Sequence, residues 1–229
     1  DWNPYYADIA ASIQQVTEDI LIRIASNLRK KTGMKNLCMA GGVALNSVAN
    51  AKIRFQAGFD DVYIQPAAGD AGGSLGAALY AYRALLGGKE KYTMEHAHHG
   101  PAYSPAEAKA FFDREGISYQ EFSDPNGELL DRTADMLLNG KVVGWYQGRS
   151  EWGPRALGNR SILADPRRSE MKDVVNRSIK FREAFRPFAP SVLVDRAGEY
   201  FDLPNPESHM PARFMLYVVP VKDSARDKL

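Results

Sequence analysis

The chain has 229 residues, of which 45% are hydrophobic and 25% are charged, proportions that are ordinary for a soluble globular protein and exclude a fibrous or disordered chain. The formal net charge is +1, so no overall charge draws the chain to nucleic acid or to a membrane surface. One cysteine excludes an internal disulfide, and the lack of a membrane-length apolar run or a signal peptide favours the cytoplasm.

The first half of the chain predicts helices that alternate with short strands. Six apolar residues recur at helical spacing and predict a helix with one apolar face, which ends at Gly33: Ile9, Ile13, Val16, Ile20, Ile24 and Leu28. Strands are predicted at 36–40 and 62–64, and helices at 45–57 and 74–86. Cys38 lies in the first strand and is expected to be a small buried hydrophobe. This alternation predicts an α/β domain with some parallel strand pairing.

Residues 87–105 interrupt this pattern with glycines, prolines and three histidines whose spacing does not suit a metal site. We place a domain boundary here, between residues 1–95 and residues 100–229. Ser104 and Pro105 then predict the start of a helix, as cap and first-turn residue. The second half adds further predicted helices at 128–138 and 171–178, and predicted strands at 117–122, 141–147, 189–194 and 214–219.

Two glycine-rich turns each follow a predicted strand and precede a helix. Gly41 and Gly42 could offer backbone N–H groups to a phosphate, although a simple tight turn fits them equally well. In the second turn Asp70 fits a helix N-cap, which the pattern alone favours, or a metal or nucleotide ligand. Because both turns would open at the same edge of the sheet, together they favour a nucleotide site.

The segment 148–167 combines glycines with Arg149, Arg155 and Arg160 directly after a predicted strand. From residue 149 to residue 186 the chain carries eight Arg and two Lys against five acidic residues. Glycine lets a backbone approach a ligand, and arginine matches phosphate or carboxylate oxygens. The segment therefore predicts the wall of an anion-binding site.

The segment 179–190 adds two further cations. If this segment is extended, Lys180 and Arg182 point to one face and could line the same anionic pocket. A solvated basic edge with Glu183 as its partner is the alternative.

These motifs resemble the O-carbamoyltransferase family, which includes nodulation and antibiotic carbamoyltransferases. Residues 148–167 and 180–190 match its C-terminal domain, and residues 40–46 and 66–76 match the end of its N-terminal domain. The resemblance implies an α/β chain in two parts. Residues 1–95 would end an actin/sugar-kinase-like domain similar to tRNA-threonylcarbamoyl transferases, and residues 100–229 would be a truncated YrdC-like domain.

The resemblance also implies a reaction and its residues. The parent enzyme would join carbamoyl phosphate and ATP into carbamoyl adenylate, then move the carbamoyl group to a hydroxyl of a small-molecule acceptor. The residues implied as catalytic are Arg149, Arg155, Lys180 and Arg182. The residues implied to bind nucleotide or phosphate are Gly41, Gly42, Asn46, Gly72, Gly73, Asn159, Arg160 and Arg186. Asp70 matches a ligand of iron or a similar divalent metal, and Mg²⁺ would accompany the ATP.

The family's other metal ligands, two histidines at His-x-x-x-His spacing, have no counterpart in this sequence. The fragment is therefore expected to be inactive alone and to bind metal weakly. Neither nucleic acid nor membrane is an expected partner, and a homodimer is compatible. Two other functions stay open: a tRNA threonylcarbamoylation enzyme, which would share both folds, and a non-catalytic nucleotide-binding module.

Overall fold

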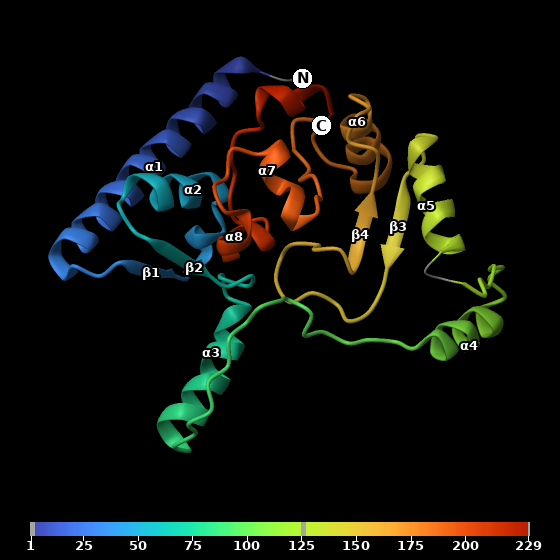
Figure 1. Ribbon diagram of the computed structural model, residues 1–229, viewed down its shortest axis with the longest axis horizontal. Helices are drawn as coiled ribbons and strands as arrows, with labels where there is room; N and C mark the ends of the chain where they lie inside the picture. The colour runs from blue at the N-terminus through green and yellow to red at the C-terminus, as the bar shows by residue number, and fades with distance from the viewer. Residues whose placement is uncertain (1–2, 125–126, 229) are drawn as a thin grey trace. The chain divides into compact units, whose positions relative to one another are not determined.

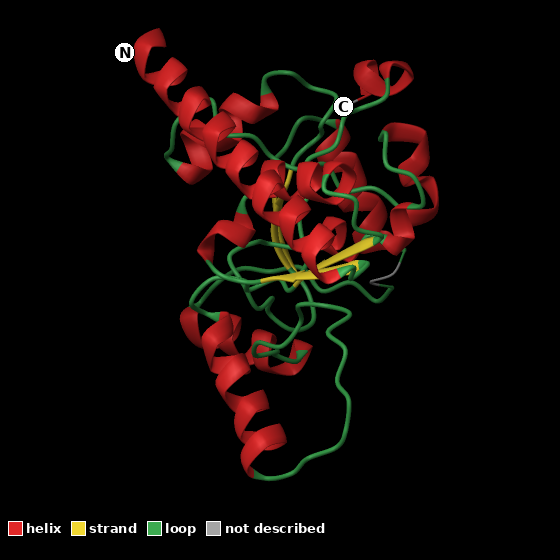
Figure 2. Cartoon of the chain, turned by 90° about the vertical axis from the view of Figure 1, so that its left-hand side faces the viewer, coloured by secondary structure: helices red, strands yellow, loops and turns green. Residues whose placement is uncertain are grey.

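A computed structural model describes residues 3–124 and 127–228 of the chain (Figure 1). Contacts divide these residues into two compact units. The first holds residues 3–97, Gly153–Arg155 and Leu193–Val221, and the second holds His98–Trp152, Ala156–Val192 and residues 222–228. Both are mixed α/β, as expected, with helices and short two-stranded sheets (Figure 2). The assignment of 1–95 and 100–229 to two domain types stays a prediction, and residues 1, 2 and 229 at its outer limits lie outside the described residues.

The first unit is built on two parallel strands. Its α-helices and strands are α1 (Pro4–Thr32), β1 (Asn36–Met39), α2 (Ser47–Gln56), β2 (Asp61–Ile64), α3 (Gly72–Tyr80), α7 (Ala197–Tyr200) and α8 (Met210–Arg213). β1 pairs with β2 in parallel register, with Leu37 opposite Val62. The expected parallel pairing is therefore confirmed. A core of small and branched side chains, among them Ala49, Ile53 and Ile64, surrounds the pair.

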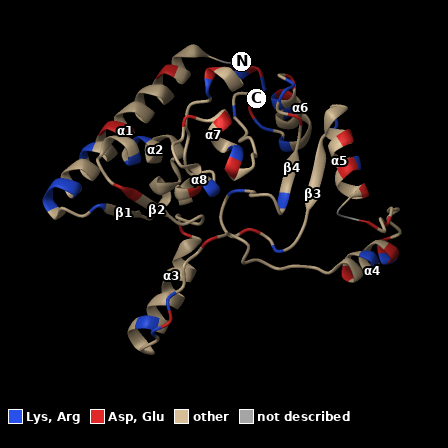
Figure 3. Ribbon diagram, in the orientation of Figure 1, with Lys and Arg blue, Asp and Glu red and all other residues tan. Residues whose placement is uncertain are grey.

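Helix α1 runs past both ends of its predicted apolar pattern. Asn3 caps its first turn and Gly33, at φ 69°, ends it in the left-handed conformation that glycine adopts without strain. The side that packs in this unit contains Glu18 and Ala25, whereas the six apolar residues of the pattern stay 44–62% exposed. Arg29, Lys30 and Lys31 occupy its last turn (Figure 3), where cations suit the negative end of the helix dipole.

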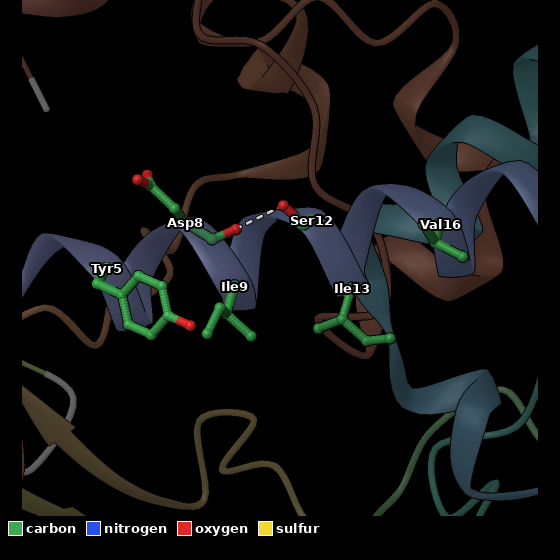
Figure 4. Close-up of a pocket in the computed structure, with 6 residues that line it drawn as sticks. All are labelled: Tyr5, Asp8, Ile9, Ser12, Ile13 and Val16. Atoms are coloured by element: carbon green, nitrogen blue, oxygen red, sulfur yellow. Dashed lines mark hydrogen bonds between the residues drawn. The ribbon is translucent and has the colours of Figure 1, made fainter.

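The exposed apolar side of α1 borders a shallow hollow of about 390 Å³. Its lining residues are Tyr5, Asp8, Ile9, Ser12, Ile13 and Val16. Figure 4 shows Tyr5, Ile9 and Ile13 projecting to one side of the helix, and the Ser12 hydroxyl donating to the Asp8 carbonyl at 2.7 Å. Within the described ranges, neither α1 nor any other helix has the length and apolarity needed to cross a bilayer.

The second unit carries an antiparallel pair. Its α-helices and strands are α4 (Pro105–Glu115), α5 (Glu128–Leu138), β3 (Val143–Tyr146), β4 (Arg160–Leu163) and α6 (Met171–Val175). β3 pairs antiparallel with β4, so Tyr146 lies opposite Arg160. The predicted cap at Ser104 is confirmed, because its side chain accepts from the Glu107 N–H and the Glu107 carboxylate accepts from the Ser104 N–H. β3 ends just before the glycine- and arginine-rich segment 148–167, called the Arg/Gly segment below, and β4 lies within its second half.

Three predicted strands are wrong. Residues 117–122 form no strand, and residues 189–194 run irregularly into a 3₁₀ turn at Val194–Arg196. Pro190 lies within that run and Pro187 lies just before it, and neither has the N–H that strand pairing needs. Residues 214–219 form no strand, although Phe214 and Leu216 are buried. They follow the end of α8 at Arg213, and the φ of 56° at Met215 is incompatible with an extended strand.

Cys38 is exposed, contrary to the prediction. It lies on β1, whose burial alternates between exposed and half-buried positions. In this unit β1 pairs only with β2 among the described strands. Cys38 occupies one of the exposed positions of this alternation, so an apolar neighbourhood in the sequence does not bury it.

Candidate functional site

The two glycine-rich turns of the first unit contact each other. The Gly41 N–H donates to the Ala68 carbonyl at 2.7 Å, and a Cβ built on Gly69 would come within 4.0 Å of the Gly42 Cα. Parallel pairing of β1 and β2 places both turns at the carboxyl ends of their strands. The prediction that they open at one sheet edge is therefore confirmed.

Glycine is required at specific points of these turns. Gly41 has a φ of 100°, which a residue with a Cβ rarely adopts. A Cβ on Gly72 would collide with the Ala67 carbonyl oxygen and the Gln65 side-chain amide. Gly42 and Gly73 have open space where a Cβ would lie. This part of the edge therefore presents bare backbone, as a phosphate site would require.

Asp70 lies exposed in the second turn and does not cap α3, whose N-cap is Ala71 without a side-chain hydrogen bond. The N-cap alternative for Asp70 is therefore wrong. Over residues 3–124 and 127–228, no group of three or more His, Cys, Asp or Glu side chains could hold a metal ion. The residues described do not by themselves form a metal site, and the metal role of Asp70 stays a prediction.

Asn46 is held by a half-buried polar side chain of α1, Gln14. Its Oδ1 caps the Ala49 N–H at 3.1 Å, and its amide pairs reciprocally with that of Gln14, at 3.0 and 3.2 Å. Gln14 also donates to Glu18, whose carboxylate forms an ion pair with Lys52. The Lys52 and Gln14 hydrogen bonds outweigh burial and lower the pKa of Glu18. In this structure Asn46 therefore fixes the start of α2 and has most of its hydrogen-bonding capacity occupied.

Most of the Arg/Gly segment lies in the second unit, where it is folded around the carboxylate of Glu151. Its Oε1 accepts from the backbone N–H groups of Leu157 at 2.8 Å, Asn159 at 2.7 Å and Arg160 at 3.2 Å. Burial works against ionisation, but these N–H groups and that of Glu151 itself outweigh it and lower its pKa. Backbone N–H groups thus converge on an anion here, and the anion is the chain's own side chain.

The arginines of this segment have different surroundings. Arg160 donates to the carbonyls of Gln147, Gly148 and Asn159 at 2.7 to 3.1 Å. Arg149 is exposed, and its guanidinium reaches the His99 carbonyl at 3.4 Å. Asn159 is buried and donates to the Arg149 carbonyl at 2.8 Å.

Arg155 belongs to the first unit, where its Nε is buried without a hydrogen-bond partner in the described structure. Its neighbour Gly153, at φ 118°, lies so close to the Pro66 carbonyl that a Cβ there would come within 2.6 Å. Of the three arginines, Arg149 is thus the most accessible to a ligand.

The remaining predicted cations lie around the turn after α6. That turn is a π-helical segment, Asn176–Lys180, which ends at Phe181 in the left-handed conformation. The segment is not extended, so the premise that placed Lys180 and Arg182 on one face is wrong. An open hollow of about 490 Å³ is lined by Arg177, Phe181, Arg182 and Glu183. Exposed Lys180 lies next to these residues in the chain.

Arg186 is held by Glu183. Its Nε donates to the Glu183 carboxylate at 2.7 Å, and both side chains are about half exposed. The N–H of Glu183 itself and the Arg186 guanidinium lower the pKa of this carboxyl. The alternative that Glu183 serves as the partner of the basic edge thus holds for Arg186.

Several residues of these sites have roles that the sequence prediction missed. Gln14 lies 32 positions before Asn46, and no local pattern links them. Glu151 lies between Arg149 and Arg155, and the sequence pattern there indicated only a positively charged site. Arg177 could have been found, because it belongs to the same run of positive charge and stands three positions before Lys180.

Two family models match the chain at different parts. The model described as Carbamoyltransferase N-terminus matches residues 3–79, and the one described as Carbamoyltransferase C-terminus matches residues 134–229. The first range holds both glycine-rich turns, and the second holds the Arg/Gly segment and the hollow after α6.

Longer proteins from several organisms are similar to the chain. An uncharacterized protein of Synechocystis sp. is 44% identical over 225 residues, covering 96% of this chain and 35% of the relative. The nodulation protein NolO of Bradyrhizobium diazoefficiens is 42% identical over 219 residues, covering 96% of this chain and 39% of NolO. An uncharacterized protein of Methanocaldococcus jannaschii is 35% identical over 216 residues, covering 91% and 35%. The chain thus spans little more than a third of the length of these relatives.

Proposed function

The chain belongs to the carbamoyltransferase family, and we propose on that premise that it forms part of an enzyme that activates carbamoyl phosphate with ATP and carbamoylates a hydroxyl. The acceptor is a small molecule. The observation that carries the proposal is the joint match of both family models, since each covers one predicted phosphate-binding region. Within this proposal, residues 3–79 belong to an actin/sugar-kinase-like domain, and residues 134–229 belong to a YrdC-like domain.

The activation step makes carbamoyl adenylate. Carbamoyl phosphate is first hydrolysed to carbamate and phosphate. A carbamate oxygen then attacks the α-phosphorus of ATP, and pyrophosphate leaves. Such a transfer depends on positioning and on neutralising the phosphoryl oxygens rather than on covalent help from the protein. The hollow lined by Arg177 and Arg182, with Lys180 beside it, supplies that kind of environment. Arg149 is the accessible cation of the Arg/Gly segment.

The transfer step is assigned to the domain that carries the glycine-rich turns. Gly42 and Gly73 leave open backbone at the sheet edge, where phosphate oxygens of the adenylate could approach. Asp70 stays predicted as one ligand of a divalent metal. The described residues do not assemble a complete metal site around it.

Pyrophosphate release from ATP by the full-length protein tests the proposal. Release should require carbamoyl phosphate and should fall when Lys180 or Arg182 is replaced by Ala. Arg226→Ala is a matched control, because Arg226 pairs with Asp223 on an exposed surface outside these sites. Release that instead needs bicarbonate and threonine would assign the protein to tRNA modification. No release under either condition would leave a nucleotide-binding module.

A further inference from the structure

The loop that follows α6 is organised around one buried side chain, Asn176. Its residue is 0% exposed. The side-chain Nδ2 donates to the Arg186 carbonyl at 2.9 Å and lies 3.4 Å from the Ala184 carbonyl. Its Oδ1 accepts from the Arg182 Nε at 2.7 Å. One amide therefore ties three positions of the loop to the end of the helix.

The backbone of Asn176 adds to this arrangement. Its carbonyl accepts from the N–H of Phe181, which closes the π-helical turn, and from the N–H of Arg182 at 3.1 Å. Phe181 takes a φ of 48°, a left-handed conformation that costs energy for a residue with a side chain. The chain reverses at Phe181, and Arg182 therefore lies next to Asn176 at the end of α6.

The orientation of the Asn176 amide follows from its partners. Two carbonyls can only accept, so they face the Nδ2 group, while a guanidinium can only donate, so it faces Oδ1. Aspartate could not donate to the two carbonyls, and its oxygens would be repelled by them, so it would not keep the position from which Asn176 holds Arg182. A branched apolar side chain could neither donate to the carbonyls nor accept from Arg182. The site therefore needs an amide of this length.

This arrangement determines how Arg182 is presented. Its Nε is bound to Asn176, and its Cζ lies 4.8 Å from the centroid of the Phe188 ring. Glu183, the one acidic residue between positions 176 and 190, pairs with Arg186. The Arg182 Nη2 also lies 3.5 Å from the Pro187 carbonyl, a long contact. Nη1 and the second hydrogen of Nη2 can therefore serve the hollow that Arg182 lines with Arg177.

We propose that Asn176 is a positioning residue that holds the Arg182 guanidinium toward a phosphoryl group bound in this hollow. The inference rests on the proposed function, because it takes the hollow as a phosphate-binding site. Asn176 itself is buried and does not touch the ligand. Its effect on binding passes through Arg182.

Calorimetric titration of the 229-residue chain with inorganic pyrophosphate tests this role. Asn176→Asp and Arg182→Lys should each weaken binding about tenfold, the size of one charge-assisted hydrogen bond. Val175→Ala is the matched control, since Val175 is the adjacent buried residue of α6 and is 3% exposed. It should lower the melting temperature and leave pyrophosphate affinity unchanged. Affinity in Asn176→Asp equal to that of the wild type would overturn the inference.

A double-mutant cycle separates positioning from a general loss of structure. If Asn176 acts through Arg182, Asn176→Asp should weaken binding little further in an Arg182→Lys background. Equal and additive losses would show that Asn176 supports the fold instead. If Asn176→Asp does not fold, Arg182→Lys and Asn176→Gln are compared in its place. Unchanged affinity in both of these variants would also overturn the inference.

The same variants distinguish failure of this inference from failure of the proposed function. If the full-length protein releases pyrophosphate with carbamoyl phosphate but Asn176→Asp keeps its kcat and its KM for ATP, the positioning role is wrong and the function stands. If the full-length protein shows no such release, yet pyrophosphate binding by the chain depends on Asn176 and Arg182, the function is wrong and the positioning role stands. Absence of any pyrophosphate binding by the wild-type chain would refute the positioning role.

Discussion

The Arg160 guanidinium lies over the Tyr146 ring, with its Cζ 3.4 Å from the ring centroid. The two residues are cross-strand partners on β4 and β3. Arg160 also donates to the backbone carbonyls of Gln147, Gly148 and Asn159. Arg160, which the family resemblance implies as a phosphate ligand, thus also links the backbone on the two sides of the Arg/Gly segment.

Replacement of Arg160 should therefore affect folding as well as binding. Arg160→Lys loses the planar fork that reaches several carbonyls and should cost about 1–3 kcal/mol of unfolding free energy. Tyr146→Leu removes only the stacked ring and should cost about 1 kcal/mol or less. Urea denaturation followed by circular dichroism measures both. Equal small losses in the two variants would show that the carbonyl contacts of Arg160 contribute little.

Asp165 should make the stability of the second unit depend on acid pH. Arg167 holds its carboxylate with two guanidinium hydrogen bonds, at 2.7 and 2.9 Å, and lowers its pKa to about 2 from an ordinary value of 3.8. Because the folded pKa is the lower one, this stabilisation is present above pH 3.8 and is lost as pH falls toward 2. Asp165→Asn should therefore be less stable than the wild type near neutral pH and should approach it in acid. Glu170→Gln, at an exposed pair with Arg168, is the control and should show no such convergence.

The ion pair between Glu18 and Lys52 should matter more than a surface pair. The Glu18 side chain is 3% exposed, so Lys52→Met would leave a buried carboxylate without its partner. We expect a loss of roughly 2 kcal/mol in unfolding free energy, below the value for a fully buried pair because Lys52 is partly exposed. Lys35→Met is the control, since Lys35 and Asp60 are both more than 60% exposed at 3.9 Å. Its loss should stay within about 0.5 kcal/mol.

A larger change from Lys35→Met than from Lys52→Met would contradict this account of Glu18. The same Lys52 variant should also loosen the Gln14 amide that pairs with Asn46, because Gln14 and Lys52 share the Glu18 carboxylate. Hydrogen exchange of the Ala49 amide, which Asn46 caps, reports on that step.

The two sides of α1 should tolerate substitution differently. Ile13 belongs to the predicted apolar pattern but is 62% exposed, so Ile13→Gln should change unfolding free energy by about 0.5 kcal/mol or less. Ala25 is 5% exposed, and Ala25→Gln should cost about 1–3 kcal/mol by overpacking and burial of an amide. Thermal denaturation of the two variants compares these losses of stability. A larger loss for Ile13→Gln would mean that its side of the helix is covered in solution.

Local signals in the sequence predicted local structure well. The Ser104 cap and the Gly33 stop are each set by residues within a few positions. Signals that depend on distant neighbours misled the prediction. Residues 189–194 and 214–219 are apolar enough for strands, but no partner strand accepts them in the described structure. The prediction that Cys38 is buried was wrong because burial also depends on distant residues, here on a neighbour that would cover its face of β1.

The candidate site was predictable in its chemistry but not in its contacts. The clustered charge between residues 149 and 186 indicated anion binding. Nothing in that pattern indicated that the Glu151 carboxylate would occupy the backbone N–H groups of the segment, or that Asn176 would hold Arg182. Those contacts depend on turns with positive φ at Gly158 and Phe181, which composition does not specify.

The exchange of labelled pyrophosphate into ATP by the full-length protein tests the central claim most directly, because it requires reversible formation of an adenylate. We predict exchange that depends on carbamoyl phosphate and is lost in Arg182→Ala but kept in Arg226→Ala. Exchange that proceeds without carbamoyl phosphate, or that survives Arg182→Ala unchanged, would contradict the account.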